Sequence, residues 1–389
     1  MRICIVTPKT SSVRSFREDL VKTLSSMGHE VFVLGEEPEG DWTDYFSSIG
    51  ASYHSYFLQR TGTSPLADIR TYRSLKGFFD EVKPDLVFNY FAKPNIYGAI
   101  AARRAGVAHV HDSVEGLGSI LGEQTTAKGR LLKRFLMLEY KYALKHVDKC
   151  FFVNEDNRSF FVDNGLIPRE KTCKVNGVGV NLDAYPYTPL PNGKPTFLFC
   201  GRLIREKGIM IYVEAARLLK SRGLDADFLV LGGLDTNPSA ITIDDLQEYI
   251  DDGSIIYCGE TEDVVPYFQK CWIYSSSSYG EGLPKTGMEA MSIGRGLVMT
   301  DCVGNRDLVV EGPAGNGTLV PCDDVEAFAE ALADCAQNRE RCEAWGAKSR
   351  LFSEEIYDVR IVNKALLEEM GVSQPPKHLA SHRSGGNLG

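Results

Sequence analysis

The sequence has 389 residues, a length that suggests two domains or slightly more at ~150 residues each. Apolar residues account for 43% and charged residues for 24%, as in ordinary globular proteins. The formal net charge of -9 argues against general nucleic-acid binding, which normally requires a basic surface. The ten cysteines form no Cys-x-x-Cys pair and several lie in apolar runs. We therefore expect buried, reduced thiols in a cytosolic protein, and neither a disulfide framework nor a zinc site.

The sequence predicts no segment that crosses a membrane. No apolar run approaches the ~20 residues of a spanning helix. The first apolar run, Ile3 to Val6, is too short for a signal peptide. Any contact with a membrane is therefore expected to be peripheral.

The first half of the chain alternates predicted strands with predicted helices. Strands are predicted at residues 2–6, 29–34, 85–89, 108–113, 149–154 and 173–180. Helices are predicted at residues 15–27, where Gly28 follows as a stop signal, and at 96–104. The alternation indicates a doubly wound parallel sheet. His109 and His111 share one strand face, but two histidines are too few for a metal site without a third ligand.

Residues 128–149 predict a basic amphipathic helix in an otherwise acidic chain. Its cations are Lys128, Arg130, Lys133, Arg134, Lys141, Lys145 and Lys149. Its apolar face comprises Leu131, Leu132, Phe135, Leu138 and Tyr142. Such a helix can lie on an anionic lipid leaflet. The alternative is an ordinary helix that packs on the sheet and leaves its charges in water.

The second half of the chain repeats the alternation after a segment rich in Pro and Gly at 185–195, which is predicted to be the linker. Strands are predicted at residues 196–200, 227–231, 254–258, 271–274, 296–300 and 317–320. Helices are predicted at residues 324–338 and 340–351, and a final amphipathic helix at 355–370. The Pro-, Ser- and Gly-containing tail is predicted to be disordered.

A loop with two glutamates eight positions apart follows the strand at 271–274. Glu281 lies in a Gly/Pro loop, and Glu289 begins the apolar run of the next helix. The start of that helix offers unpaired backbone N–H groups and a positive dipole end, which favour a phosphate. Glu281 can accept hydrogen bonds from sugar hydroxyls, and Glu289 can reach a ribose. The alternative is a capped surface helix with solvated glutamates.

A cationic turn follows the strand at 196–200, in the segment Gly201 to Gly208. Arg202 supplies a planar fork and Lys207 a compact charge, and both suit a phosphate. Loops at the carboxyl ends of parallel strands converge on one crevice. The cationic loop and the acidic loop together suggest a nucleoside-diphosphate sugar, although a solvated basic turn is the alternative.

The Gly-Arg-x4-Lys-Gly turn and the Glu-x7-Glu loop resemble the donor site of glycosyltransferase family 4, whose members retain the donor configuration. The resemblance implies the GT-B fold, with two Rossmann-like domains facing a central cleft. It places an acceptor domain at 1–187, a nucleotide-sugar domain at 188–354, a helix at 355–371 crossing back to the first domain, and a tail at 372–389. The resemblance covers nearly the whole chain.

Three segments, Val114–Gly118, Phe152–Glu155 and Gly232–Ser239, resemble a narrower bacterial group. That group transfers N-acetylgalactosamine or a similar sugar to a polyprenyl-diphosphate-linked sugar. The resemblance implies a hexosyltransferase that uses a UDP-N-acetylhexosamine and works at the inner face of the cell membrane in glycan assembly. No Asp-x-Asp motif stands in a suitable loop, so neither a metal nor another cofactor is expected.

The resemblance also implies roles for individual residues. Arg202, Lys207 and Glu281 are expected at the reacting diphosphate and sugar, and His111 or Asp112 near the sugar, although a satisfied histidine is the alternative for His111. The remaining donor contacts are expected from Gly259, Glu260, Gly282, Leu283, Pro284 and Glu289. The acceptor contacts are expected from Arg17, Glu115 and Gly116, and a surface position is the alternative for Arg17.

Other functions stay open at this stage. The same family includes enzymes that use another UDP-hexose or a non-lipid acceptor. A nucleotide-sugar 2-epimerase shares the architecture but needs a carboxylate and histidine for proton removal. A non-catalytic sugar-nucleotide-binding subunit is the third possibility, and the intact set Arg202, Lys207, Glu281 and Glu289 argues against it.

Overall fold

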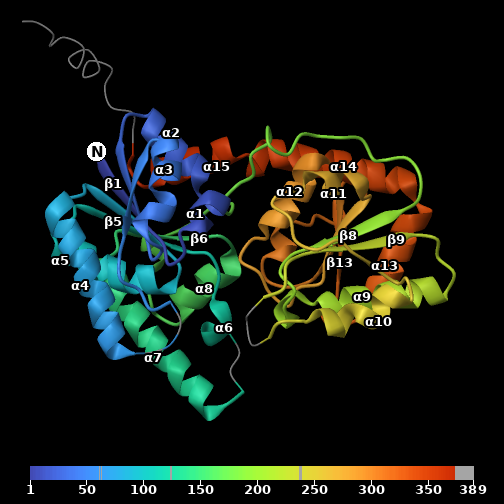
Figure 1. Cartoon of the computed structure of the whole chain (residues 1–389), viewed down its shortest axis with the longest axis horizontal. Coiled ribbons are helices and arrows are strands. Elements are labelled where there is room, and N and C mark those ends of the chain that lie inside the picture. Colours follow the sequence, from blue (N-terminus) through green and yellow to red (C-terminus); the bar gives the residue numbers. More distant parts are fainter. Residues whose placement is uncertain (61, 63, 123–124, 236–238, 373–389) are drawn as a thin grey trace, which may run out of the picture. The chain divides into compact units, whose positions relative to one another are not determined.

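The structure, a computed structural model, describes residues 1–372 except 61, 63, 123–124 and 236–238. The chain forms two compact units (Figure 1). Unit 1 contains Met1–Val175 and the residues from Asn363 onward, and unit 2 contains Asn176–Val362. The division after Val175 lies before the Pro- and Gly-rich segment 185–195, which belongs to unit 2. The tail predicted to be disordered lies outside the described residues, apart from residue 372.

Unit 1 is built on a parallel sheet with strand order β3-β2-β1-β4-β5-β6-β7. Its strands are β1 (Arg2–Val6), β2 (Glu30–Gly35), β3 (Ala51–Ser55), β4 (Leu86–Tyr90), β5 (His109–Val114), β6 (Lys149–Phe152) and β7 (Thr172–Lys174). Helices cover both faces of the sheet (Figure 1), so the central strands are buried along nearly their whole length. The strand order reverses between β1 and β4, where such sheets place their ligands.

The helices of unit 1 are α1 (Ser11–Phe16), α2 (Glu18–Ser26), α3 (Glu39–Ser48), α4 (Pro65–Val82), α5 (Ala99–Arg104), α6 (Gly118–Leu121), α7 (Ala127–Ala143) and α8 (Glu155–Asp163). Short 3-10 turns occur at η2 (Leu144–His146) and η3 (Arg169–Lys171), and a π-helical turn, η1 (Pro94–Gly98), precedes α5. The strand β3 and the helices α3, α4, α6 and α8 had not been predicted. Polar residues interrupt β3, α3 and α4, which weakens their hydrophobic periodicity.

Unit 2 has a parallel sheet with strand order β10-β9-β8-β11-β12-β13. The strands are β8 (Thr196–Cys200), β9 (Asp227–Leu231), β10 (Ile256–Tyr257), β11 (Ile273–Ser276), β12 (Gly296–Thr300) and β13 (Gly317–Val320). The helices are η4 (Arg205–Lys207), α9 (Ile209–Ser221), α10 (Ile243–Asp251), α11 (Val265–Lys270), α12 (Lys285–Ile293), η5 (Asn305–Asp307), α13 (Val325–Gln337) and α14 (Arg339–Phe352). The strand order reverses between β8 and β11.

The segment predicted as a single helix at 355–370 has a different structure. The helix α14 continues into a π-helical turn, η6 (Ser353–Tyr357), and a new helix, α15 (Val359–Glu369), starts after Asp358. Asp358 has an extended ψ of 125°, which interrupts the helix. Residues from Asn363 onward belong to unit 1, where Glu369 forms an ion pair with Lys149, so the last helix returns to the first domain as predicted.

Three other predicted elements have different bounds. The helix predicted at 15–27 is broken at Arg17, whose φ of -133° is not helical. The helix predicted at 128–149 ends as an α-helix at Ala143. The strand predicted at 173–180 is short and ends at Lys174, after which the chain enters unit 2.

No helix in the described part of the chain combines the length and the apolar character that a membrane span requires. The side chains that fill the two cores come from both faces of each sheet. Each unit therefore has its own core and places its own polar residues at the carboxyl edge of its sheet.

Candidate active site

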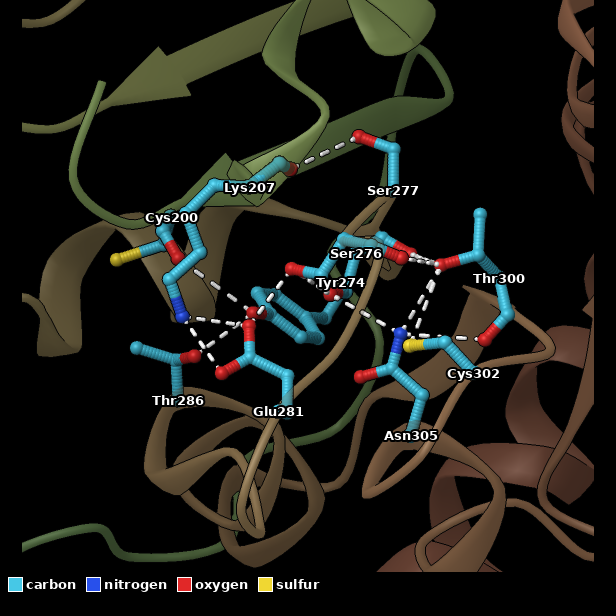
Figure 2. Close-up of polar contacts among 11 residues, drawn as sticks. Cys200, Lys207, Tyr274, Ser276, Ser277, Glu281, Thr286, Thr300, Cys302 and Asn305 are labelled. Atoms are coloured by element: carbon cyan, nitrogen blue, oxygen red, sulfur yellow. Dashed lines mark hydrogen bonds and ion pairs between the residues drawn. The ribbon is translucent and has the colours of Figure 1, made fainter. Parts of the chain in front are cut away.

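The two loops that carry the predicted donor residues meet in unit 2, at the point where its strand order reverses. The loop after β8 contains Lys207, and the loop after β11 contains Glu281. Lys207 Nζ lies 2.5 Å and 2.6 Å from the two carboxylate oxygens of Glu281. Figure 2 shows the two side chains approaching from their separate loops. The parallel sheet brings together two residues that are 74 positions apart in the chain.

Close backbone contact holds the two loops together. Gly208 has a φ of 64°, and a Cβ atom at this position would lie 1.8 Å from the carbonyl oxygen of Ser277. The Ser277 hydroxyl donates a hydrogen bond of 2.7 Å to the Gly208 carbonyl oxygen. Only glycine combines this conformation with this approach. The Gly208 position therefore fixes the distance between the cationic and the acidic loop.

Further contacts orient the Glu281 carboxylate. The Ser278 hydroxyl donates to Oε1 at 2.7 Å. The Glu281 backbone N–H donates to the Val303 carbonyl oxygen at 2.9 Å. Only 12% of the Glu281 side chain is exposed. The carboxylate is thus held in one direction before any ligand arrives, which is the preorganisation that electrostatic catalysis requires.

Further hydrogen bonds hold the loop after β11, which carries Glu281. Tyr274, on β11, shares a hydrogen bond of 2.7 Å with the hydroxyl of Thr286 in the first turn of α12. The Thr300 hydroxyl donates to the Ser278 carbonyl oxygen, and Asn305 Nδ2 donates to Thr300 Oγ1 at 3.1 Å (Figure 2). The loop that carries Glu281 is therefore braced by the strand before it and by the loop after β12.

Glu289 lies in the second turn of α12 and is 5% exposed. Its Oε1 atom accepts a hydrogen bond of 2.7 Å from the Tyr185 hydroxyl and one of 2.5 Å from Lys285 Nζ. The negative charge of Glu289 and the burial of the phenol raise the pKa of Tyr185, with burial as the larger cause, so the hydroxyl remains a donor. Tyr185 and Lys285 thus hold the carboxylate that was predicted to bind a ribose.

The other predicted donor residues lie on neighbouring loops of unit 2. Arg202 is more exposed than Lys207, at 62% of its side chain, and pairs with Asp235 at 3.3 Å. Gly259 follows β10, and the Glu260 carboxylate lies over Gly233, where a Cβ atom would be 2.5 Å from it. The structure therefore joins Lys207 to Glu281 directly and places Arg202 against a different acid.

The residues between the two glutamates form the approach to α12. Gly282 and Leu283 are half-buried, and Pro284 is the buried N-cap of the helix. No side chain of the described residues caps this helix, so its first N–H groups face the loop. These groups and the helix dipole favour an anion at this position.

Two of the predicted acceptor residues meet in unit 1, at the point where its strand order reverses. Arg17, which is 1% exposed, donates from Nη2 to Glu115 Oε1, and this oxygen also accepts a hydrogen bond of 2.9 Å from the Ser113 hydroxyl. The Arg17 guanidinium lies 5.4 Å and 5.7 Å from the ring centres of Phe88 and Tyr90. Arg17 is therefore buried, which corrects the alternative of a surface arginine.

The Arg17 guanidinium still has donors to offer. Within the described part of the chain, Nε and Nη1 are buried and have no hydrogen-bond partner. An unsatisfied buried N–H carries a desolvation cost, and more so when it is charged. An anionic ligand oxygen would satisfy these groups. Gly116, the third predicted acceptor residue, is exposed in the loop after β5.

His111 lies inside its strand and not at the strand's end, where it had been expected. It is the third residue of β5, is 3% exposed, and its ring lies 6.0 Å from the ring of Phe151. Burial lowers its pKa to about 4, so the ring is neutral at pH 7. The neighbouring Asp112 is fully buried, accepts a hydrogen bond of 2.8 Å from Asn89, and has a pKa raised well above its ordinary value by burial. The expected contact of either residue with a sugar stays a prediction.

Sequence reasoning missed several residues that shape the two sites. Ser278 belongs to a run of four serines that had been interpreted only as a loop. Tyr185 lies in the segment interpreted as a linker, where nothing indicates a contact with α12. Phe88 and Tyr90 are strand residues, and their position beside Arg17 depends on the pairing of β1 with β4. Within the described residues, no group of three or more His, Cys, Asp or Glu side chains is arranged to hold a metal ion.

Comparisons with known proteins match both halves of the chain. The model described as "Glycosyl transferase 4-like domain" matches residues 13–176, and that described as "Glycosyl transferases group 1" matches residues 194–338. A protein of Campylobacter jejuni, N,N'-diacetylbacillosaminyl-diphospho-undecaprenol alpha-1,3-N-acetylgalactosaminyltransferase, is 29% identical over 78% of this chain and 81% of its own. An Escherichia coli protein, UDP-Gal:alpha-D-GlcNAc-diphosphoundecaprenol alpha-1,3-galactosyltransferase, is 25% identical over 75% and 76%.

Solved structures match the fold over nearly the whole chain. Sucrose-phosphate synthase from Thermosynechococcus elongatus has a TM-score of 0.77 at 15% identity and covers 95% of this chain and 98% of its own. The Anabaena protein HepE in complex with UDP has a TM-score of 0.75 at 15% identity, with 95% and 100% covered. These similarities show the GT-B fold. Since the two family models together cover most of the chain, the protein belongs to glycosyltransferase family 4.

Proposed function

We propose that this protein is a retaining glycosyltransferase that moves an N-acetylhexosamine, which we assign as GalNAc, from a UDP-sugar to a polyprenyl-diphosphate-linked sugar. The observation that carries the proposal is the contact of Lys207 with both oxygens of Glu281 at the strand-order reversal of unit 2. This arrangement puts a cation for the diphosphate beside a carboxylate for the sugar. The names of the Campylobacter and Escherichia relatives support a lipid-diphosphate acceptor.

In the proposed reaction the bond between the anomeric carbon and the diphosphate oxygen breaks, and a bond from that carbon to an acceptor hydroxyl oxygen forms. The acceptor proton passes to the departing diphosphate. Negative charge grows on the diphosphate as it leaves, and Lys207, Arg202 and the start of α12 stabilise that charge. Glu281 holds the sugar hydroxyls and Glu289 the ribose. No covalent intermediate with the protein and no metal ion is part of the proposal.

The acceptor is assigned to unit 1. Arg17 has two buried donor atoms without partners among the described residues, as a phosphate-binding guanidinium would have before its ligand arrives. Glu115 and Ser113 fix the orientation of Arg17 from the end of β5. Ligand oxygens could accept one charge-assisted hydrogen bond from Nε and another from Nη1, which point in different directions.

The acceptor lipid places the enzyme at the inner face of the cell membrane. On α7, Leu131 is 69%, Phe135 50% and Leu138 65% exposed, while the helix packs on unit 1 through Tyr140 and Ala143. The apolar face that was expected to enter a membrane is therefore not the face that packs on the core. Exposed cations on the same helix, such as Arg134 and Lys141, suit an anionic leaflet.

A panel of UDP-sugars tested against extracted lipid-linked sugars, with mass spectrometry of the products, tests the proposal. We expect a mass increase of one N-acetylhexosamine on the lipid-linked acceptor, formed about a hundredfold more slowly by the Lys207→Ala protein. A UDP-hexose as the preferred donor would correct the sugar assignment, as the name of the Escherichia relative illustrates. Conversion of a UDP-sugar without any acceptor would indicate an epimerase, and no conversion with any acceptor would indicate a non-catalytic subunit.

A further inference from the structure

An apolar groove lies on unit 1, away from the residues assigned to the reaction. The helices α4 and α7 both pack against η1, and the space they leave has a volume of about 970 Å³. The apolar and aromatic residues that line it are Pro65, Ile69 and Tyr72 of α4, Tyr97 of η1, Ile100 of α5, and Leu131, Leu132 and Phe135 of α7. The charged residues Asp68, Arg104, Lys128 and Glu139 border it. The volume lies at the upper end of the range for small-molecule sites.

The groove is flanked by apolar side chains that extend into solvent. Leu66, on α4, is 80% exposed and Leu138, on α7, is 65% exposed, but neither lines the groove. Soluble proteins rarely leave contiguous apolar patches of this kind uncovered. A flat bilayer surface would cover these two flanking residues and leave the hollow between the helices unfilled. A flexible apolar chain would fill it.

The two carboxylates that border the groove are already paired. Lys93 donates to Asp68 at 2.7 Å, and the Tyr97 hydroxyl donates to Glu139 at 2.8 Å. These pairs leave no demand for a polar ligand in the middle of the groove. The lining therefore matches a hydrocarbon ligand better than a sugar or a peptide.

The groove runs from the carboxyl edge of the sheet toward its amino edge. Lys93 follows the carboxyl end of β4, and its ion pair with Asp68 places the first turn of α4 at that edge. At the opposite end, Arg103 of α5 donates to the His146 carbonyl oxygen just before β6 begins. One end of the groove thus opens at the carboxyl edge of the sheet, at which Arg17 and Glu115 also lie, but Arg17 packs beside Phe88 and Tyr90, on the face of β4 opposite to the groove helices.

Positive charge at the carboxyl edge of the sheet suits the diphosphate of a lipid. Lys128, in the first turn of α7, borders the groove. Arg17 lies buried at the same edge of the sheet with two unpartnered donor atoms among the described residues. An amphiphile with a diphosphate head and a long apolar tail would therefore meet Lys128 at the carboxyl edge and apolar side chains along its length, with Arg104 bordering the groove at the end of α5.

We propose that the groove between α4, η1, α5 and α7 binds the isoprenoid chain of the acceptor lipid, with the diphosphate held at the carboxyl edge of the sheet. The proposal rests on the proposed function for the identity of the lipid. It adds a binding site for the chain itself, so that the enzyme recognises the lipid and not only its sugar. Leu131 and Phe135 then belong to this site, which leaves Leu138 and the exposed cations of α7 for the membrane contact.

The test uses the full-length protein and a farnesyl diphosphate that carries a diazirine at the chain end. After illumination, mass spectrometry locates the labelled peptides. We expect label in α4 and α7, on the residues that line the groove. Unlabelled farnesyl diphosphate should compete, whereas phosphatidylglycerol vesicles at the same lipid concentration should compete far less.

A matched pair of variants on α4 sharpens the test. Ile69→Trp fills the groove from its wall, whereas Leu66→Trp adds the same side chain one turn away, outside it. Both positions are exposed, so neither change should disturb the core. Ile69→Trp should reduce labelling about tenfold, the factor that two buried methylene groups are worth. Leu66→Trp should leave labelling unchanged.

Three results would overturn the proposal. These are label outside the groove, equal labelling of Ile69→Trp and the parent protein, and competition by phosphatidylglycerol as strong as that by farnesyl diphosphate. The labelling does not depend on turnover. Absence of sugar transfer in a protein that labels in the groove would therefore count against the proposed function and not against the chain-binding site.

Discussion

Lys207 contacts both oxygens of Glu281, at 2.5 Å and 2.6 Å, although the two residues come from loops after different strands. Without a ligand, the ammonium group and the carboxylate neutralise each other. In the proposed complex the ammonium group binds the diphosphate and the carboxylate binds the sugar hydroxyls. The contact therefore keeps both groups in place and lowers the cost of leaving either charge half-buried and unpaired.

The first prediction concerns this cation. Lys207→Ala should reduce kcat/KM about a hundredfold, because one charge-assisted contact to the departing diphosphate is worth roughly 3 kcal/mol. Lys207→Arg should lose less, and Arg202→Ala should behave like Lys207→Ala. The measurement is initial-rate kinetics with a fixed lipid-linked acceptor. Near-normal turnover in both alanine variants would show that the diphosphate is bound elsewhere.

The second prediction concerns metal ions. Sugar transfer should continue in excess EDTA, because Lys207, Arg202 and the start of α12 are proposed to stabilise the diphosphate. Rates are compared with and without chelator and after addition of Mg²⁺. Complete loss in EDTA that Mg²⁺ restores would reject the metal-free mechanism.

The third prediction concerns binding to membranes. Lys133 donates to the Gly122 carbonyl oxygen at 3.0 Å, whereas Arg134 and Lys141 are exposed, so these two are the better targets for charge reversal. Changing both to Glu should weaken co-sedimentation with anionic vesicles, and the remaining binding should weaken further as salt rises, because exposed charges are screened within ~10 Å at 0.1 M salt.

The control for this prediction reverses two exposed cations outside α7, Arg222 and Lys364, which changes the net charge by the same amount. The control should sediment like the parent protein. UDP-sugar binding, measured by calorimetry, should be unchanged in both variants. If reversal at Arg134 and Lys141 leaves vesicle binding intact, α7 is only a structural helix and another surface reaches the lipid.

The fourth prediction concerns the support of Glu289. Tyr185→Phe removes one of the two hydrogen bonds to Glu289 Oε1, and the KM for the UDP-sugar should rise about tenfold, since a hydrogen bond to a charged group contributes roughly 1.5–3 kcal/mol. The value of kcat should change less, because a ribose contact is made in both the ground and transition states. Tyr187→Phe, at a 48% exposed tyrosine nearby, is the control. Equal kinetics for Tyr185→Phe and its control would show that Glu289 does not contribute to donor binding.

The fifth prediction concerns stability in acid. Burial is the main cause that lowers the pKa of His111 to about 4, and the nearby Asp148 opposes the shift. Unfolded histidine titrates near pH 6.5, so between about pH 6.5 and pH 4 the unfolded chain binds more protons than the folded one. The stability from the neutral ring is therefore complete above pH 6.5 and is lost as the pH falls through this window, by up to about 3 kcal/mol.

Urea unfolding at several pH values between 7 and 4 measures this effect. His111→Phe should lose stability less steeply with falling pH than the parent protein. His109→Gln changes an exposed histidine on the same strand and should keep the parental slope. A His111→Phe protein with the parental slope would place the acid sensitivity in other groups.

The sequence by itself determined the elements that carry the donor residues. The predicted strands at 196–200, 227–231, 296–300 and 317–320 have the observed bounds, because parallel strands buried on both faces are continuous apolar runs between turn residues. A local pattern of this kind needs no knowledge of distant contacts. The Gly-Arg-x4-Lys-Gly turn and the Glu-x7-Glu loop lie within single segments, and for the same reason they were visible before the fold was known.

Only the tertiary structure decided which residues meet. The pairing of Lys207 with Glu281 depends on the order of β8 and β11 in the sheet, and the support of Glu289 by Tyr185 depends on a segment that had been interpreted as a linker. Arg17 was predicted inside one helix, but the chain breaks there and the guanidinium packs beside Phe88 and Tyr90. On α7, periodicity revealed an apolar face without showing whether the core or the solvent receives it. Each of these outcomes depends on contacts between segments far apart in the chain, which no local pattern specifies.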